Sequence, residues 1–273
     1  MRIVSVTSGK GGVGKTNLSC NLGIAMAQMG YRVVLFDADL GLANLDVVLG
    51  AQAEYSIHHA LEGNLTLDEV ISKGPAGVRF LSGGSGISKL LNVSKKRLQG
   101  FLLELADLEA TTDVLIFDTG AGVDQRVLTF LKAADEVVVV VTPDPASIAD
   151  AYATIKVLLR TKKDARIQVL MNQVESEKQA ELLYHKLNDI AGHFLEANLF
   201  YTGAVRYDSE IVPLIRKRQP FVIADPKLKA SRDVVDIAKE CATRIDRYDL
   251  QTNLRHRLEI AFGIAPATEE LAA

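Results

Sequence analysis

The chain has few of the residues that mark disulfide-rich, metal-binding or membrane-spanning proteins. Cysteine occurs twice, at Cys20 and Cys241, and no C-x-x-C pair is present. This argues against a cysteine-ligated zinc or iron–sulfur site within one chain and indicates a reducing, cytoplasmic environment. No apolar run approaches the ~20 residues of a transmembrane helix, and the first strand candidate begins at Arg2, so we expect no signal peptide.

The sequence also lacks an excess of positive charge and any low-complexity linker. Its formal net charge is −3, which gives no overall attraction to nucleic acid, so we do not expect nucleic acid as a partner. Two basic runs, 95–97 and 215–218, are candidates for a local patch, but such runs are more often solvated faces. Apolar residues make up 48% of the chain, as is typical of a soluble globular protein. Glycine and proline are thinly spread, which favours one large domain.

Short apolar runs alternate with helical patterns through most of the chain. The strand candidates are 2–7, 32–37, 78–82, 113–118, 136–142, 166–171 and 198–204. The helix candidates lie near 16–29, 56–61, 66–72, 94–109, 124–133, 146–160, 176–192, 208–217 and 228–247. Several strands are continuous apolar runs, which suit a parallel sheet covered on both faces. The pattern therefore predicts an α/β fold with a doubly wound, mostly parallel sheet and helices on both faces.

A glycine-rich motif between the first strand and the first helix carries the strongest functional signal. The motif Gly9-Lys10-Gly11-Gly12-Val13-Gly14-Lys15-Thr16 matches the P-loop pattern G-x-x-x-x-G-K-[ST] in the strand–loop–helix context that the pattern requires. We predict that this loop and the following Asn17 bind a nucleotide. Lys15 should reach the β- and γ-phosphates, and the Thr16 hydroxyl should ligate Mg²⁺. A single nucleotide does not require Lys10, which we interpret as reaching a phosphate across a dimer interface, as an arginine finger acts in trans. The alternative for Lys10 is a solvated surface lysine.

Aspartates stand at the ends of two further strands, where ligands of doubly wound sheets bind. The strand 32–37 runs into Asp37 and Asp39, and the strand 113–118 ends at Asp118. A nucleotide site needs a carboxylate near Mg²⁺ and a group that orients the attacking water. An apolar strand closed by aspartate is the Walker B arrangement, so Asp118 is predicted to hold Mg²⁺ directly or through water. The alternative for such acidic residues is turning a loop or capping a helix.

The motif K-G-G-V-G-K-T is the deviant Walker A signature, and with it the chain resembles the MinD/ParA group of dimerising ATPases. The segment D-A-D-L-G-L-A-N-L-D resembles switch I of that group, and D-T-G-A-G resembles switch II, although Pro or Ala often stands where Gly120 is found. The resemblance implies that Asp39 positions the hydrolytic water at the metal and that Asn44 senses the γ-phosphate. It also implies that Asn172 reads the adenine edge, with a turn asparagine as the alternative, and that Arg206, at a usual proline position, lies near the base.

These residues together imply a slow, dimer-activated ATPase that uses ATP and Mg²⁺, with Lys10, Lys15 and Asp39 as catalytic residues. The segment from Thr142 to Lys156 resembles the flagellar-number regulators, the FlhG/FleN branch, and the resemblance extends over about residues 1–245. Members of this branch act on flagellar number or placement through an FlhF-type GTPase, C-ring proteins or a FleQ-type transcription regulator. Many carry an N-terminal extension that stimulates FlhF, which is not expected here. The alternatives are a MinD-type division-site regulator and a ParA-type DNA partition ATPase.

The segment 249–273 follows the predicted P-loop ATPase domain, 1–248. Leu250, Leu254 and Leu258 recur at helical spacing, with basic residues between them. A basic amphipathic helix can lie on an anionic bilayer, and the resemblance favours peripheral contact with the inner face of the cell membrane. The alternatives are a terminal helix packed on the body and a partner-binding helix.

Overall fold

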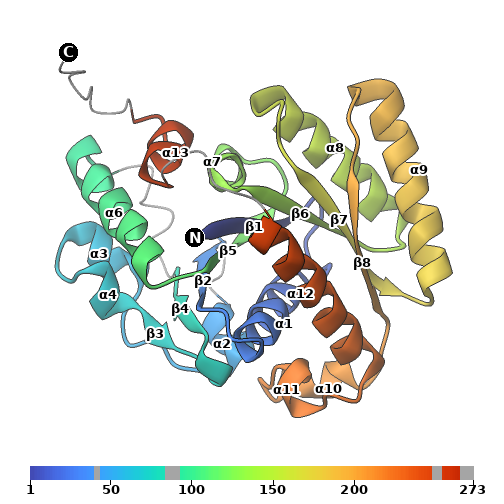
Figure 1. Ribbon diagram of the computed structural model, residues 1–273, viewed down its shortest axis with the longest axis horizontal. Helices are drawn as coiled ribbons and strands as arrows, with labels where there is room; N and C mark the ends of the chain where they lie inside the picture. The colour runs from blue at the N-terminus through green and yellow to red at the C-terminus, as the bar shows by residue number, and fades with distance from the viewer. Residues whose placement is uncertain (40–43, 84–92, 248–253, 265–273) are drawn as a thin grey trace.

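A mostly parallel sheet forms the centre of the computed structural model, which describes residues 1–39, 44–83, 93–247 and 254–264 (Figure 1). The strands are β1 (Arg2–Ser8), β2 (Val33–Ala38), β3 (Ser72–Lys73), β4 (Arg79–Leu81), β5 (Val114–Ala121), β6 (Glu136–Val141), β7 (Ile167–Val174) and β8 (Phe200–Arg206). Within the described chain they form one sheet of 8 strands in the order β3-β4-β2-β5-β1-β6-β7-β8. Of these described strands, only β3 runs antiparallel to its neighbour. The predicted doubly wound fold is confirmed.

Helices cover both faces of this sheet. They are α1 (Lys15–Gln28), α2 (Leu45–Leu49), α3 (Ile57–Glu62), α4 (Leu67–Val70), α6 (Lys95–Asp107), α7 (Gln125–Ala133), α8 (Pro145–Thr161), α9 (Glu177–Leu195), α10 (Ile211–Arg216), α11 (Phe221–Ala224), α12 (Lys229–Arg247) and α13 (Leu254–Ala261). One hydrophobic cluster joins the sheet to α1, α2, α11 and α12. The other joins it to α3, α4, α6, α7, α8, α9 and α13. Among the described helices, none combines the length and apolar character needed to cross a bilayer.

The valine run of β6 shows why the sheet is buried on both sides. Val137, Val139 and Val141 belong to one hydrophobic cluster, and Val138 and Val140 belong to the other. Successive side chains of a strand point to opposite faces, so a strand inside a two-faced sheet must be apolar at every position. The continuous apolar run therefore specifies a central parallel strand.

Some boundaries and short elements differ from the predictions. The sequence pattern missed β3, α2 and α11, which are each 5 residues long or shorter and thus too short for a periodic signal. The predicted strand 198–204 is found at Phe200–Arg206. The strand starts later than predicted because Leu199, although buried, does not pair with β7. Its backbone N–H donates instead to Asn188 Oδ1 on α9, 2.8 Å away.

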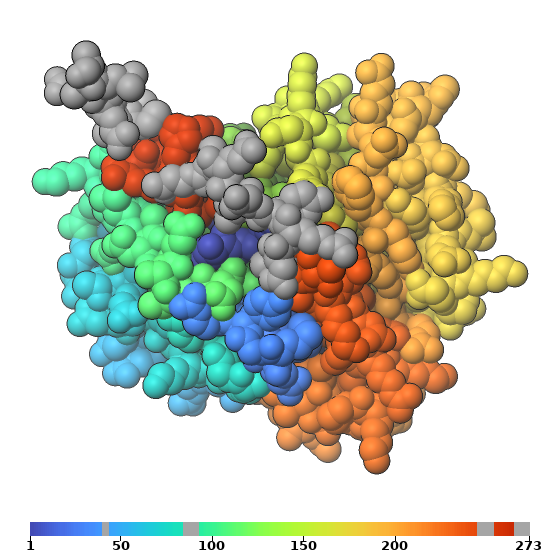
Figure 2. Space-filling model, viewed as in Figure 1, coloured from blue at the N-terminus to red at the C-terminus, as the bar shows by residue number. Residues whose placement is uncertain are grey.

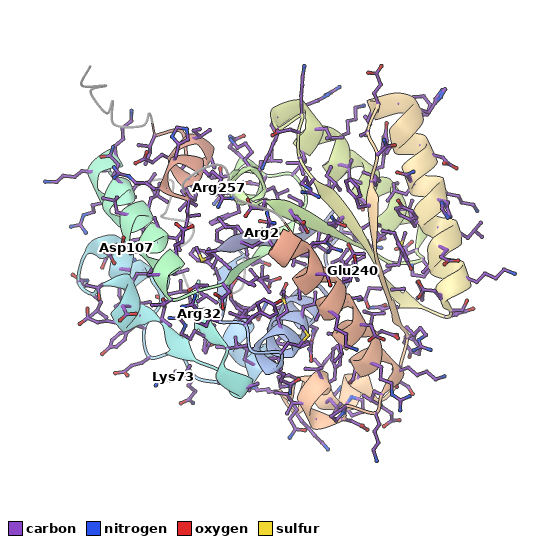
Figure 3. All side chains as sticks on the ribbon, viewed as in Figure 1. Arg2, Arg32, Lys73, Asp107, Glu240 and Arg257 are labelled. Atoms are coloured by element: carbon purple, nitrogen blue, oxygen red, sulfur yellow. The ribbon has the colours of Figure 1, made fainter. Side chains whose placement is uncertain are left out.

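The C-terminal helix α13 packs its apolar face on the body of the protein. Leu254 and Leu258 are fully buried, and α13 contacts α6 and α7. The Phe262 ring stacks edge-on against Phe130 of α7 at 5.6 Å. Arg257, labelled in Figure 3, forms an ion pair with Asp135, just beyond the end of α7. The apolar stripe that predicted a membrane helix is thus covered in this structure, while Leu250 lies outside the described residues.

Candidate nucleotide-binding site

The P-loop connects the carboxyl end of β1 to the first turn of α1. Its path needs positive φ at two glycines, 80° at Gly12 and 92° at Gly14, a conformation that costs glycine little. Helix α1 begins at Lys15 with no acidic residue in its first turn and no side-chain cap from the described residues. The N–H groups of that turn are therefore left for another partner, which is the arrangement that binds anions at helix N-termini.

Two glycines of the loop are required by close packing, and two face open space. A Cβ on Gly9 would lie 2.1 Å from the backbone carbonyl carbon of Asp150 in α8. A Cβ on Gly14 would lie 2.7 Å from the Asn172 amide nitrogen. At Gly11 and Gly12 an added Cβ would meet no atom within 4 Å among the described residues. The loop is thus clamped at its ends and open in its middle, as a phosphate cradle must be.

Lys15 is a buried cation that has no direct counter-ion among the described residues. Its residue is 8% exposed, and burial lowers the pKa of its ammonium although Asp118 and Asp39 act to raise it. No ion pair links Lys15 to any residue that the structure describes. A buried charge without a paired ion is unfavourable, so an anion bound in the loop would stabilise it. This chemistry fits a nucleotide phosphate.

Asp118 ends the apolar part of β5 beside Thr16 and Ser19 of α1. The Ser19 hydroxyl donates to Asp118 Oδ1 at 2.8 Å. Burial raises the pKa of Asp118 to about 6, while hydrogen bonds from Thr16 and Ser19 and the charge of Lys15 act to lower it. A buried carboxylate next to a hydroxyl is a donor set of the kind that Mg²⁺ binds, and a cation there would favour the charged carboxylate. The predicted metal residues Thr16 and Asp118 are therefore adjacent.

Asp37 holds the two described ends of the predicted switch I segment. Its carboxylate accepts the backbone N–H groups of Asp39, Asn44 and Leu45 at 3.1, 3.0 and 3.3 Å. Burial and the neighbouring Asp118 raise the pKa of Asp37 to about 7, although these three N–H groups act to lower it. The predicted residues Asp39 and Asn44 are thereby brought to the same strand edge as Asp118; residues 40–43 lie outside the described residues.

Gly120 faces the carboxylate of Asp39. A Cβ at position 120 would lie 3.3 Å from Asp39 Oδ1, tight enough to require one of the two groups to shift. The absence of a side chain at 120 leaves room for the predicted water-positioning residue. The departure from the Pro or Ala usual at this position therefore changes the immediate surroundings of Asp39.

Lys10 is exposed and bound to α8. Its ammonium pairs with the Asp144 carboxylate at 2.5 Å, and this bond raises the pKa of Lys10. Asp144 also caps α8 by accepting the backbone N–H of Ala146 at 3.1 Å. The first lysine of the P-loop is thus held by another element of the same chain and remains accessible from solvent.

A cavity of about 210 Å³ adjoins the end of the P-loop. It is lined by Gly14, Asn17, Leu18, Asn172, Gln173, Val205, Arg206, Tyr207, Asp208, Ile211, Val212, Ile215 and Phe221. Asn172 and Arg206, which were predicted to lie near the base, therefore meet at one pocket with Asn17, which was predicted to bind the nucleotide together with the P-loop. Its mixture of apolar walls and amide groups suits a nucleobase.

The side chains of Asn172 and Arg206 are held by protein partners. Asn172 donates its amide to the Val13 carbonyl at 2.7 Å, which ties β7 to the P-loop. Arg206 forms a two-pronged pair with Asp233 of α12, with nitrogen–oxygen distances of 2.6 and 2.9 Å. Arg206 thus lines the pocket with its guanidinium bound to a carboxylate, and its contact with a base stays a prediction.

Sequence reasoning missed three groups at this site: Ser19, Asp144 and Gln173. Ser19 lies one helical turn after Thr16 and could have been found from the i,i+3 spacing on α1. Asp144 is 134 positions from Lys10, and no local signal indicates such a pairing. Gln173 follows the predicted Asn172 directly, but its exposure at the cavity depends on the local path of β7.

A larger hollow of about 950 Å³ lies away from this site, between the C-terminal ends of α8 and α9. Figure 2 shows it as a notch at the top of the view, between the yellow-green and gold segments. None of the residues predicted to bind nucleotide or metal lines it. Size alone therefore does not identify the functional site.

Comparison with known proteins gives one family and several full-length relatives. The sequence profile of the CobQ/CobB/MinD/ParA nucleotide binding domain matches residues 4–221. The chain is 39% identical to the antiactivator FleN of Pseudomonas aeruginosa over 259 residues, 95% of this chain and 91% of that protein. It is 34% identical to the flagellum site-determining protein YlxH of Helicobacter pylori over 246 residues, 90% of this chain and 83% of that protein.

Solved structures of the cell-division protein MinD share the fold. A chain of the MinC:MinD cell division complex of Aquifex aeolicus superposes with a TM-score of 0.73 and 26% identity, covering 93% of this chain and 100% of that chain. The septum site-determining protein MinD of Pyrococcus horikoshii, solved with Mg-ADP, gives a TM-score of 0.71 and 22% identity, covering 90% of this chain and 99% of that chain. The sheet and its covering helices thus have counterparts among known structures.

Proposed function

The chain belongs to the CobQ/CobB/MinD/ParA family of nucleotide-binding domains, and from that premise we propose that it is a switch ATPase regulating flagellar number or placement. In this proposal it binds ATP and Mg²⁺, dimerises, hydrolyses ATP slowly and acts through partner proteins. The observation that carries the nucleotide part is the buried Lys15 ammonium, which has no ion-pair partner in the described chain and lies at the base of an open, glycine-lined loop.

The residues of the site have distinct proposed roles. Lys15 and the N–H groups of the loop would hold the β- and γ-phosphates, and Thr16 and Asp118 would hold Mg²⁺. The bound metal supplies charge neutralisation at the phosphates. Asp39 would orient the attacking water. Its place against Gly120 gives this carboxylate space, and Asp37 fixes the backbone on which it sits.

Lys10 would act in a second copy of the chain. In this structure its ammonium is exposed and paired with Asp144, so it can leave the pair without opening the core. Reaching a phosphate in trans would place positive charge where negative charge accumulates during hydrolysis, as an arginine finger does. Dimerisation and hydrolysis would then depend on the same lysine.

The flagellar part of the proposal rests on the relatives. Proteins named antiactivator FleN and flagellum site-determining protein YlxH align along nearly the whole chain. The proposed partners are therefore an FlhF-type GTPase, C-ring proteins or a FleQ-type transcription regulator. We propose a cytoplasmic location. Membrane contact through 249–273 would require α13 to leave α6 and α7, because Leu254 and Leu258 are buried against the body.

Light scattering with size-exclusion chromatography tests the ATPase switch. The wild-type protein is expected to be a monomer in ADP and a dimer in ATP and Mg²⁺. Lys15→Ala and Lys10→Ala should stay monomeric in ATP, and Asp39→Ala should remain dimeric because hydrolysis fails. Lys163→Ala, an exposed lysine away from the site, serves as the matched control. A wild-type protein that stays monomeric in ATP refutes the dimer switch.

Asp144→Asn probes the pair that holds Lys10. Asparagine still caps a helix but lacks the charge that binds the ammonium, so the variant should dimerise at lower ATP concentration than wild type. An unchanged or higher requirement for ATP contradicts the proposed release of Lys10.

The flagellar role is tested in cells. A deletion strain should carry an altered number of flagella by electron microscopy, and the wild-type gene should restore the normal number. The Lys15→Ala gene should fail to do so. A deletion strain with unchanged flagellation refutes this part of the proposal.

A further inference from the structure

Gln173 has a strained backbone conformation and lines the cavity of about 210 Å³ that adjoins the P-loop. Four non-glycine residues in the described chain have positive φ: Ala76, Gln173, Glu196 and Arg218. Among these, only Gln173, with φ of 59°, lines the cavity beside the P-loop. Glutamine has no special tolerance for this region, unlike Asn, Asp or His. Strain of this kind tends to persist at ligand sites, where the surrounding structure enforces it.

A bulge in β7 produces this conformation. Asn172 pairs with Val205 and Val174 pairs with Arg206, so Gln173 is an extra residue on its strand. Bulges next to active sites re-aim side chains. The Gln173 amide nitrogen lies 4.0 Å from the position that a Cβ on Gly14 would occupy, which places the amide at the last turn of the P-loop. The bulge thus brings a second amide next to that of Asn172.

The two amides have different hydrogen-bonding freedom. The Val13 carbonyl can only accept, so the Asn172 nitrogen must donate to it, and the Asn172 oxygen remains as an acceptor. The Gln173 amide forms no hydrogen bond with any residue that the structure describes and can donate or accept. The cavity therefore has the Asn172 oxygen as an acceptor beside the Gln173 amide, which can either donate or accept.

We propose that Gln173 is a second base-reading residue, which works with Asn172 to select adenine over guanine. Adenine presents an exocyclic amine donor beside a ring-nitrogen acceptor, whereas guanine presents two acceptors on the same edge. The Asn172 oxygen accepts from the amine, and the Gln173 nitrogen donates to the ring nitrogen. Guanine would place its carbonyl oxygen against the Asn172 oxygen, and this repulsion would keep its own ring-nitrogen acceptor from reaching the Gln173 amide. This inference rests on the proposed nucleotide site and adds the residue that sets its base preference.

Binding of ADP and GDP to the purified full chain, measured by calorimetry with Mg²⁺, tests the proposal. These nucleotides carry the two bases without the γ-phosphate, so the proposed dimerisation and hydrolysis do not enter the measurement. Gln173→Gly keeps the backbone conformation accessible and removes the amide. Losing one hydrogen bond should weaken ADP binding about fivefold and leave GDP binding unchanged, so the ADP preference falls by the same factor.

Glu196→Gly is the matched control, because Glu196 also has positive φ, 53°, but caps the end of α9 away from the cavity. Both glycine variants should melt at or above the wild-type temperature, and only Gln173→Gly should change base preference. Gln173→Asn tolerates the same backbone with a shorter amide and provides a second test if the glycine variant fails to fold.

If both Gln173 variants discriminate between ADP and GDP as strongly as the wild-type protein does, the inference is wrong. A wild-type protein that binds neither nucleotide refutes the proposed function itself, so the two failures are distinguishable.

Discussion

Gly9→Ala is expected to destabilise the protein strongly, because the new methyl group has no space. Its carbon would lie 2.1 Å from the carbonyl carbon, 2.2 Å from the carbonyl oxygen and 2.5 Å from the Cβ of Asp150. Two of these atoms are backbone atoms inside α8, so no rotation of a side chain relieves the contact. Overpacking of a well-packed region costs about 1–3 kcal/mol, and a backbone clash belongs at the upper end of that range. For a chain of this size, a loss of about 3 kcal/mol lowers Tm by roughly 6–12 °C.

Gly11→Ala is the control within the same loop. A Cβ there meets no described atom within 4 Å, and the position does not require positive φ. Substitutions at such surface positions usually change stability by less than about 0.5 kcal/mol. Calorimetry or circular dichroism of both variants without nucleotide gives the comparison. Equal melting temperatures for the two variants would show that α8 does not clamp the loop as described.

Two further predictions concern the core. Leu258→Ala in α13 should lower the free energy of unfolding by about 2–5 kcal/mol, because Leu258 is fully buried. Ile260→Ala should have little effect, because Ile260 is 59% exposed. Guanidinium titration measures both variants, and equal effects would mean that α13 is undocked in solution. Cys20 and Cys241 should resist thiol reagents at pH 8 until the protein unfolds. Both are buried, and burial raises the pKa of Cys20 and raises the pKa of Cys241 to about 11, so little reactive thiolate forms. Reaction of either thiol in the native protein contradicts this prediction.

Local sequence patterns predicted the features that short segments specify by themselves, such as a buried strand or a P-loop. The valine run of β6 must be apolar at every position because it is covered on both faces, and this property is visible without the fold. The P-loop glycines and Asp118 could likewise be placed, since their motifs include the strand that precedes them. The sheet order then brings Asp37 and Asp118 into register on adjacent strands, as expected for neighbouring carboxyl ends.

Contacts between distant segments could not be predicted in the same way. Arg206 was expected near the base, and it lines that cavity, but its pairing with Asp233 depends on how α12 crosses β8. The bulge at Gln173 leaves no mark in the residue pattern, because glutamine is an unusual choice for positive φ. The basic amphipathic pattern of α13 describes its chemistry correctly, but an apolar stripe alone cannot say whether protein or lipid covers it.

Helix α8 links the segment that resembles the flagellar regulators to the chemistry of the P-loop. The segment from Thr142 to Lys156 contains most of this helix. Its backbone at Asp150 packs against Gly9, and its N-terminal Asp144 binds Lys10. Both contacts involve the first two residues of the P-loop motif, Gly9 and Lys10. A movement of Lys10 toward a second chain would break the bond that joins the loop to the start of α8, while the packing at Gly9 would keep the loop in place. Such a movement would therefore change the surface of the protein at the end of α8 near the loop.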